Sequence, residues 1–517
     1  MSIHKNHKRI AVNTLMLYIR MFIVMLVSLY TSRIVLNELG IQDFGIYSLV
    51  GGIVGMMGFM NNAMTSATQR FLSFEIGRND SLQTRNVFNM SLNIHLIVAI
   101  IFLLLAETIG LWFVKTQIEI PLERINALLW VYQFSVFTLL LNIISVPYYS
   151  IIIAYERMGF FAILSIVEVV LQLFVIYLIQ FVVEFDILIF YAFLLFCVSF
   201  IVRSIYFIHC NISYKESKFK FYWNNELFKN LFSHIRWMLL GTSANMLGNQ
   251  GLNILINIFF GVTVNAARGI AFQIQGAVHS FIVNFMLAVR PQIIKTYAQK
   301  NFEEMYRLLF TSSKFSFYLL LYISLPVMLL TGSILKWWLK IIPDDSIIFT
   351  QLIIIDLFFI VLFTSLTTVS QASDKIKSYQ IIVTLGYVLL FGLSYIIFKL
   401  GYPAYFAFII ALFISSLSLV FRLINLKSSI SFPVYRYVKE VLFRVIAVVL
   451  FATPIPIVIL YKITDPLQQF LFVTIFSFFS VSMSIWLVGI TNSERKFVKE
   501  KLRAIYSKFK KLMIYKN

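Results

Sequence analysis

The sequence has 517 residues, of which 60% are hydrophobic and only 13% are charged, and its formal net charge is +20. Soluble globular chains are about 45–50% apolar and about 25% charged. The composition therefore excludes an ordinary soluble protein and indicates a chain surrounded by lipid. Cys197 and Cys210 lie in or at the end of one apolar segment and allow neither a disulfide framework nor a metal site. The first apolar segment is too long for a signal peptide, so we expect the mature protein to keep it.

Apolar segments long enough to cross a bilayer recur along the whole chain. A transmembrane helix needs roughly 20 apolar residues, and helices are required because lipid cannot hydrogen-bond to open backbone groups. We therefore predict an all-α membrane protein with about 14 transmembrane helices. In chain order, the predicted spans are 11–37, 44–66, 87–114, 125–152, 160–183, 187–209, 234–259, 264–290, 310–335, 346–370, 379–398, 403–424, 440–461 and 467–490.

The basic residues predict the orientation of these spans. With the N-terminus inside, 31 of the 43 Lys and Arg residues fall in inner segments and 6 in outer segments. This distribution follows the positive-inside rule, so we expect both termini in the cytoplasm. The net charge is then mainly a topology signal and an attraction to anionic lipid. It does not indicate nucleic-acid binding, and we expect no nucleic-acid partner.

The segments outside the predicted spans are short. The longest outer loops have about ten residues each, and the largest inner connection, 211–233, separates the first six spans from the next six. This connection mixes Lys with Phe, Tyr and Trp, which suits a helix lying in the membrane interface. A solvated linker is the alternative interpretation. We expect the tail, 491–517, to form a basic amphipathic helix on the membrane surface.

One arginine lies deep in the first predicted span. Arg20 is about ten residues into that span, on a helix face that it shares with Asn13 and Thr31. An ionisable side chain inside the membrane costs roughly 2.5–3.5 kcal/mol on insertion scales, and is therefore a candidate for function.

Two longer polar stripes follow one another on spans seven and eight. In span seven an Asn recurs at every fourth residue, and four polar side chains of span eight fall within about 80° of one another. Hydrogen bonding between helices would explain any single residue. Two stripes together with an Arg favour a water-filled, substrate-binding cavity. The candidate residues are Asn245, Asn249, Asn253 and Asn257, then Asn265, Arg268, Gln275 and His279, with Asn62 of span two.

Two acidic side chains lie well inside spans, Glu168 in span five and Asp356 in span ten. They either neutralise a neighbouring charge or bind the ion that couples transport, Na⁺ or H⁺. Glu168 has two candidate partners at similar depth, Arg20 and His95. The sequence has no Gly-rich phosphate loop, zinc-ligand spacing or nucleophile elbow. We therefore expect no catalytic residue, no metal and no cofactor, and a protein that is not an enzyme.

Two stretches resemble a known transporter family. The first is LNELGIQDFGIYSLVGGIVGM, Leu36–Met56, and the second is VNAARGIAFQIQGAVHSF, Val264–Phe281, with Arg290-Pro291-Gln292 and Lys295 after it. Both resemble the polysaccharide transporter, or O-antigen-type oligosaccharide flippase, family of the multidrug/oligosaccharidyl-lipid/polysaccharide exporter (MATE-like) superfamily. Gly45 and Gly269, each followed by Ile, are candidates for equivalent points of two repeated halves.

The resemblance implies a fold of two six-helix lobes arranged as a V, with two extra C-terminal helices. It assigns 1–210 to the N-terminal lobe, 211–233 to a cytoplasmic interfacial linker, 234–424 to the C-terminal lobe, 425–490 to the two extra helices and 491–517 to the tail. Members flip undecaprenyl-diphosphate-linked oligosaccharides for O-antigen, capsule or related glycans across the bacterial inner membrane. The family's cationic cavity matches Arg20 and Arg268. The lack of a mid-depth Arg in span two argues against a peptidoglycan-precursor flippase.

Three functions are compatible with these residues. The leading one is a lipid-linked oligosaccharide flippase, because Arg binds a diphosphate through charge-assisted bonds and Asn and Gln suit sugar hydroxyls. It would work by alternating access as a monomer, in contact with membrane lipids and with other polysaccharide assembly proteins. The second is a cation-coupled multidrug antiporter of the same fold. The third, a polysaccharide polymerase or ligase, would need a large outer loop.

Overall fold

The computed structural model describes residues 2–57, 59–116, 121–180, 186–339, 342–373, 376–492, 494–496 and 499. Every secondary-structure element in these residues is helical. Twelve helical segments of this part of the chain are long and apolar enough to cross a membrane. The prediction of an all-α, multi-pass membrane protein is therefore confirmed.

The expected count of about fourteen spans stays a prediction. The two predicted spans without a counterpart among the twelve segments are 44–66 and 234–259. The first is divided between helices α1 (Ser2–Met57) and α2 (Phe59–Gly77). The second lies within α8 (Asn225–Ala298), where the repeated Asn residues lower the mean hydropathy.

Two glycines interrupt the longest helices in the same way. Gly40 in α1 has φ 72° and ψ 172°, and Gly261 in α8 has φ 80° and ψ −177°. Glycine adopts positive φ readily because it has no Cβ. The breaks fall between predicted spans one and two and between spans seven and eight, so the two halves of the chain share this feature. When the halves are aligned on these breaks, Gly45 falls opposite Ala266 and not Gly269.

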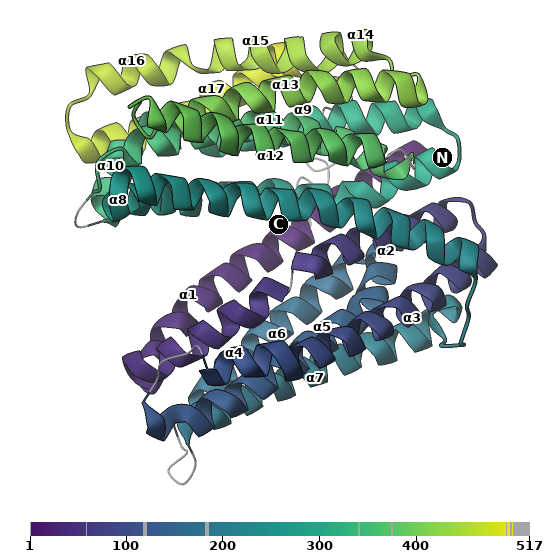
Figure 1. The fold of residues 1–517 in the computed structure, drawn as a ribbon. Coiled ribbons are helices and arrows are strands. Elements are labelled where there is room, and N and C mark those ends of the chain that lie inside the picture. The colour runs from purple at the N-terminus through teal and green to yellow at the C-terminus, as the bar shows by residue number, and fades with distance from the viewer. Residues whose placement is uncertain are drawn as a thin grey trace, which may run out of the picture. The chain divides into compact units, whose positions relative to one another are not determined.

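The helices pack into two compact units, each of which is described here by itself. Unit 1 comprises Met1–Leu247, Asn284–Met305 and Thr368–Thr384. Besides α1 and α2, its helices are α3 (Ser81–Leu105), α4 (Leu111–Thr116), α5 (Ile125–Ala154), α6 (Met158–Ile179) and α7 (Ile187–Ser213). A π-helical turn, Ala106–Gly110, connects α3 to α4. Helix α5 is at the centre of the unit and packs against α2, α3 and α7, while α1 packs along α6 (Figure 1).

Unit 2 comprises Gly248–Val283, Tyr306–Thr367 and Leu385–Asn517. A buried cluster that includes Ile256, Phe349 and Phe408 forms part of its core. Its helices are most of α9 (Phe302–Leu329), α10 (Thr331–Trp338), most of α11 (Ser346–Ala372), the end of α12 (Ile376–Lys399), α13 (Phe406–Ile430), α14 (Val434–Tyr437), α15 (Phe443–Ala452), α16 (Pro454–Lys462) and α17 (Pro466–Ser484).

The connection between predicted spans six and seven, 211–233, is α-helical only at its two ends. A short 3-10 turn, Lys215–Ser217, is followed by an extended stretch, 218–224, and α8 begins at Asn225. The Asn224 side chain caps α8 by accepting a hydrogen bond from the Leu227 backbone N–H at 2.9 Å. Most of the predicted tail helix lies outside the described residues. The lobe boundaries stay predictions, since unit 1 also includes the connection and parts of α8, α9, α11 and α12.

Candidate functional site

A partly buried ion pair lies between two helices of unit 1. Glu168 of α6 binds Arg203 of α7, with 3.0 Å between the carboxylate Oε1 and the guanidinium Nη2. Arg203 Nε also donates a hydrogen bond to Asn142 Oδ1 of α5, at 2.8 Å. The sequence had suggested Arg20 or His95 as the partner of Glu168, so this partner was missed. The available signal was an Arg inside predicted span six.

The two suggested partners have other surroundings. The guanidinium of Arg20 lies over the ring of Phe161, 4.7 Å from its centroid, and Glu168 is still close enough to attract it electrostatically. His95 is buried in α3, where its Nδ1 lies 2.6 Å from the carbonyl oxygen of Ser91. Glu168 is therefore flanked by two guanidinium groups, and this cluster carries a net positive charge inside the membrane.

A polar cavity of about 570 Å³ adjoins this cluster within unit 1. Helices α1, α5, α6 and α7 form its walls, and Asn142 belongs both to the wall and to the cluster. Hydroxyl and amide side chains can donate and accept hydrogen bonds, so this lining suits a polyhydroxylated ligand or water. The polar residues of the wall are Ser28, Thr31, Tyr47, Ser135, Thr138, Asn142, Gln172, Tyr191 and Ser199.

In unit 2, Arg268 joins the two polar stripes predicted from the sequence. Its Nη1 donates to Asn253 Oδ1 at 3.1 Å, and its Nη2 donates to the carbonyl oxygen of Asn249 at 3.0 Å. The guanidinium lies over the ring of Phe272, 4.3 Å from the centroid. These contacts form because α8 reverses direction at Gly261 and brings its two segments together. Arg268 is 8% exposed and has no carboxylate partner among the described residues.

The structure does not bring the other predicted site residues into these contacts. Asp356 in α11 is partly buried, has Ser415 as its polar neighbour, and leaves its Oδ1 without a hydrogen bond in the described chain. The carbonyl oxygen of the Asn265 side chain also lacks a described partner. Asn62, Asn245 and Asn257 are exposed, and Asn265, Gln275 and His279 are partly buried. The functional roles of all the residues predicted for the site, Arg20 and Arg268 included, stay predictions.

A third cluster, at the ends of the unit 1 helices that the predicted orientation places on the inner side, was not predicted. Glu156 lies in the turn between α5 and α6, its side chain is 1% exposed, and its φ of 61° is one that glutamate rarely adopts. Its carboxylate binds Arg9 Nε of α1 at 3.1 Å and Lys295 Nζ of α8 at 2.5 Å. The Gln292 side chain donates to the same carboxylate, and Asn13 Nδ2 donates to the Glu156 carbonyl at 3.1 Å.

Two further contacts hold the same end of the bundle. Arg70 of α2 donates from Nε and Nη2 to the carbonyl oxygens of Gln371 and Ala372, each at 3.1 Å. At Gly77 an added Cβ would lie 2.8 Å from the Lys295 Cα, so only glycine allows this approach of α2 to α8. The term inner latch is used below for Arg9, Glu156, Gln292, Lys295 and Arg70. Gln292 and Lys295 belong to the motif noted in the sequence, whereas nothing in the sequence singled out Glu156.

The fold of this chain is similar to that of the MATE transporters of the MOP superfamily. No family profile matches the sequence, and no curated protein matches it. A MATE protein in its bent conformation superposes with a TM-score of 0.71 at 14% identity, covering 82% of this chain and 96% of the other.

Two further solved structures have the same fold. An outward-facing multidrug resistance MATE transporter gives a TM-score of 0.69 at 13% identity, covering 80% of this chain and 94% of the other. A MOP superfamily transporter from Pyrococcus furiosus, for which a binding pocket of reverse polarity is described, gives a TM-score of 0.67 at 14% identity, covering 82% of this chain and 96% of the other. At this level of identity the similarity is one of fold.

Proposed function

We propose that this protein is a membrane transporter that flips an undecaprenyl-diphosphate-linked oligosaccharide from the inner to the outer leaflet of a bacterial inner membrane. The observation that carries this proposal is the excess of positive charge at buried and partly buried positions. In unit 1, Glu168 pairs with Arg203 and also attracts Arg20 electrostatically, so one carboxylate faces two guanidinium groups. In unit 2, Arg268 has amide and carbonyl partners but no described carboxylate.

A diphosphate headgroup matches this charge. Guanidinium groups bind phosphate oxygens through two parallel charge-assisted hydrogen bonds, and they remain charged when partly buried. A cationic substrate would be repelled by the same groups. The polar wall of the 570 Å³ cavity in unit 1 supports a sugar ligand, because its hydroxyl and amide groups both donate and accept hydrogen bonds.

The inner latch fits an alternating-access mechanism. It joins α1, α2 and the α5–α6 turn, from the first half of the sequence, to α8 and the end of α11, from the second half. A transporter must open and close at each side of the membrane in turn. We therefore propose that the latch breaks when the cytoplasmic side opens.

The experiment that tests the function is transport in vesicles that contain the purified protein. The substrate is a fluorescent undecaprenyl-diphosphate sugar, and its appearance in the other leaflet is followed by quenching with an impermeant reagent. Arg20→Ala and Arg268→Ala should each lower the flipping rate about 100-fold. Lys399→Ala, at an exposed lysine at the end of α12, should leave the rate unchanged. Equal flipping by all three variants would reject the proposal.

A cation-coupled multidrug antiporter is the second candidate function. Asp356 supports it, since one of its oxygens lacks a hydrogen bond in the described chain and could bind a cation. One of the solved structures with this fold is also a multidrug resistance transporter. Efflux of a cationic dye driven by a Na⁺ or H⁺ gradient, without flipping of the lipid-linked sugar, would favour this candidate. Asp356→Asn and Glu168→Gln should then each abolish the gradient dependence.

The proposed orientation has its own test. Reporter fusions after 224 and at the C-terminus should report a cytoplasmic location, and a fusion after Trp338 should report the outside. A C-terminus on the outside would mean an odd number of spans and would overturn the assignment of the latch to the cytoplasmic side.

A further inference from the structure

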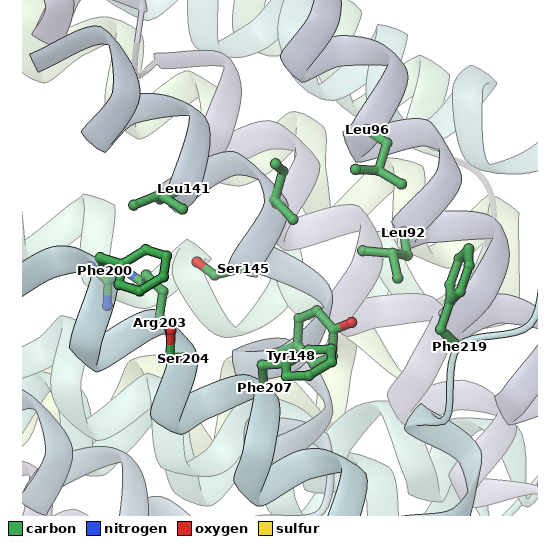
Figure 2. Close-up of a pocket in the computed structure, with 11 residues that line it drawn as sticks. Leu92, Leu96, Leu141, Ser145, Tyr148, Phe200, Arg203, Ser204, Phe207 and Phe219 are labelled. Atoms are coloured by element: carbon green, nitrogen blue, oxygen red, sulfur yellow. The ribbon is translucent and has the colours of Figure 1, made fainter. Parts of the chain in front are cut away.

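A second cavity of unit 1 lies between α3 and α7, over the surface of α5 (Figure 2). It is a groove of about 400 Å³ with mostly apolar walls. Figure 2 shows Leu92 and Leu96 on one side of the groove and Leu141 and Phe200 on the other. This groove is separate from the polar cavity described above, and no residue of its wall lines both. The apolar walls suit a hydrocarbon chain and not a sugar.

One wall residue of the groove, an aromatic side chain, comes from outside the helices. Phe219, in the extended stretch 218–224, forms the end of the groove opposite Phe200. We call this stretch the aromatic strap. Besides Phe219, two of its aromatic side chains, Phe221 and Trp223, are exposed. Trp rings are enriched at the level of lipid headgroups, because they are apolar with one polar N–H, and Trp223 suits this level.

The aromatic strap is held in place by two buried amide side chains of α3. Asn89 Oδ1 accepts a hydrogen bond from the Lys220 backbone N–H at 2.8 Å. Asn93 Nδ2 donates to the Tyr222 carbonyl oxygen, also at 2.8 Å. Asn89 and Asn93 are 1% and 5% exposed, so these bonds are shielded from water. The position of Phe219 at the groove is therefore built into the packing of α3.

Basic residues lie next to Phe219 in the chain. Lys218 and Lys220 flank it and are exposed, and each Cα is about 3.8 Å from that of Phe219. Lys215, in the preceding turn, is also exposed. The distribution of basic residues assigns this side to the cytoplasm, where anionic lipids attract basic segments. An apolar groove whose wall residue Phe219 stands between two exposed lysines matches a molecule that has a hydrocarbon chain and an anionic headgroup.

We propose that this groove binds an anionic phospholipid of the inner leaflet, with an acyl chain along α3, α5 and α7 and the phosphate against Lys218 and Lys220. Arg203 lines the groove and forms the ion pair with Glu168, so the bound chain covers this ion pair from the bilayer. The proposal does not depend on which substrate the protein transports, because the groove does not share a wall residue with the polar cavity.

Native mass spectrometry of the full-length protein tests the site. Purified protein is titrated with phosphatidylglycerol and, separately, with phosphatidylcholine of the same acyl chains. We expect one tightly retained phosphatidylglycerol, with affinity reduced about tenfold in the Lys218→Gln/Lys220→Gln variant. A matched variant, Lys336→Gln/Lys399→Gln, removes two exposed lysines elsewhere and should retain the lipid. Equal retention of both lipids, or equal loss in both variants, would overturn the proposal.

A photoactivatable group on the acyl chain locates the lipid independently. Phosphatidylglycerol that carries a diazirine in its tail should crosslink to peptides of α3, α5 and α7, and the double variant Lys218→Gln/Lys220→Gln should lose these crosslinks. Phe219→Ala should reduce them while leaving the folded protein intact, because that ring is 54% exposed. Crosslinks spread evenly over all lipid-facing helices would show that the groove holds no particular lipid.

Discussion

Buried charges have different partners at the inner end of unit 1 and in the interior of unit 2. In the inner latch, the Glu156 carboxylate meets both Arg9 and Lys295. In unit 2, the Arg268 guanidinium meets the side chain of Asn253, the carbonyl of Asn249 and the ring of Phe272, and no carboxylate of the described residues. A charge that is paired inside the protein fixes the positions of helices. A charge that lacks an opposite charge keeps its attraction for a ligand.

The Arg20–Glu168–Arg203 cluster combines both situations. Glu168 and Arg203 form a pair that holds α6 against α7. Arg20 is attracted to the same carboxylate without forming the short contact. One guanidinium of the cluster is therefore structural and the other remains available, which is why we place Arg20 with Arg268 as a candidate substrate ligand.

The largest expected effect is on the free energy of unfolding, when the paired carboxylate of the inner latch is removed. Glu156→Leu leaves the ammonium of Lys295 buried without its carboxylate, and removing one partner of a buried pair costs about 3–5 kcal/mol. The free energy of unfolding, measured in detergent or bicelles, should fall by about this amount. Glu226→Gln, an exposed carboxylate in the first turn of α8, is the control and should change it by less than about 0.5 kcal/mol. A similar small change for Glu156→Leu would show that the latch does not stabilise the fold.

Substitution of Arg268, which has no carboxylate partner among the described residues, should affect transport more than stability. Arg268→Ala removes the charge and should lower the transport rate about 100-fold in vesicles, whereas Arg268→Lys keeps the charge but loses the planar fork and should lower it about tenfold. Arg268 also holds two segments of α8 together, so folding is checked by the melting temperature of each variant. If Asn253→Ala, which removes only the partner, reduced transport as much as Arg268→Ala, the role of the charge would be refuted.

The intermediate cluster can be tested by a double-mutant cycle. Arg203→Met and Glu168→Gln are made singly and together, and the free energy of unfolding is measured for each protein. Both side chains are about one-fifth exposed, so we expect a coupling energy of only about 1 kcal/mol. A coupling near zero would mean that the pair does not hold α6 against α7.

The smallest expected effect is the change with pH in the contribution of a paired carboxylate of unit 2. Glu494 binds the buried Lys314 with 2.8 Å between Oε2 and Nζ. Burial raises the pKa of this carboxyl. The attraction of Lys314 and the hydrogen bond from the Thr491 backbone N–H together lower the pKa by more than burial raises it, so the net shift is downward from the ordinary value of 4.5. The pair therefore stabilises the fold above that value, and its contribution is lost as the pH falls through the lowered pKa.

This dependence is measured as the melting temperature of the protein and of Glu494→Gln. The difference between them should be largest near neutral pH. It should begin to shrink below about pH 4.5 and disappear as the pH falls through the lowered pKa, where the folded carboxylate also becomes protonated. A difference that stays constant from about pH 7 down through that range would contradict a role for the charge of Glu494.

The sequence by itself determined the class of the fold and the residues that could not face lipid without a reason. Long apolar segments allow only helices in a bilayer, and this predicts an all-α protein from composition alone. The Asn stripe, Arg268 and Gly261 are close in sequence, so helical periodicity and one turn suffice to bring Asn253 to Arg268. Local spacing predicts such contacts well.

Tertiary structure alone decided the partners that are distant in the chain. Glu168 could attract any nearby cation, and the packing of α6 against α7 selected Arg203 over Arg20 and His95. Glu156 gave no signal, because its partners are 147 and 139 residues away in the sequence. The aromatic strap is extended because Asn89 and Asn93 bind its backbone, although its composition suited a helix. Periodicity describes which residues share a face, and only the packing of helices determines what that face meets.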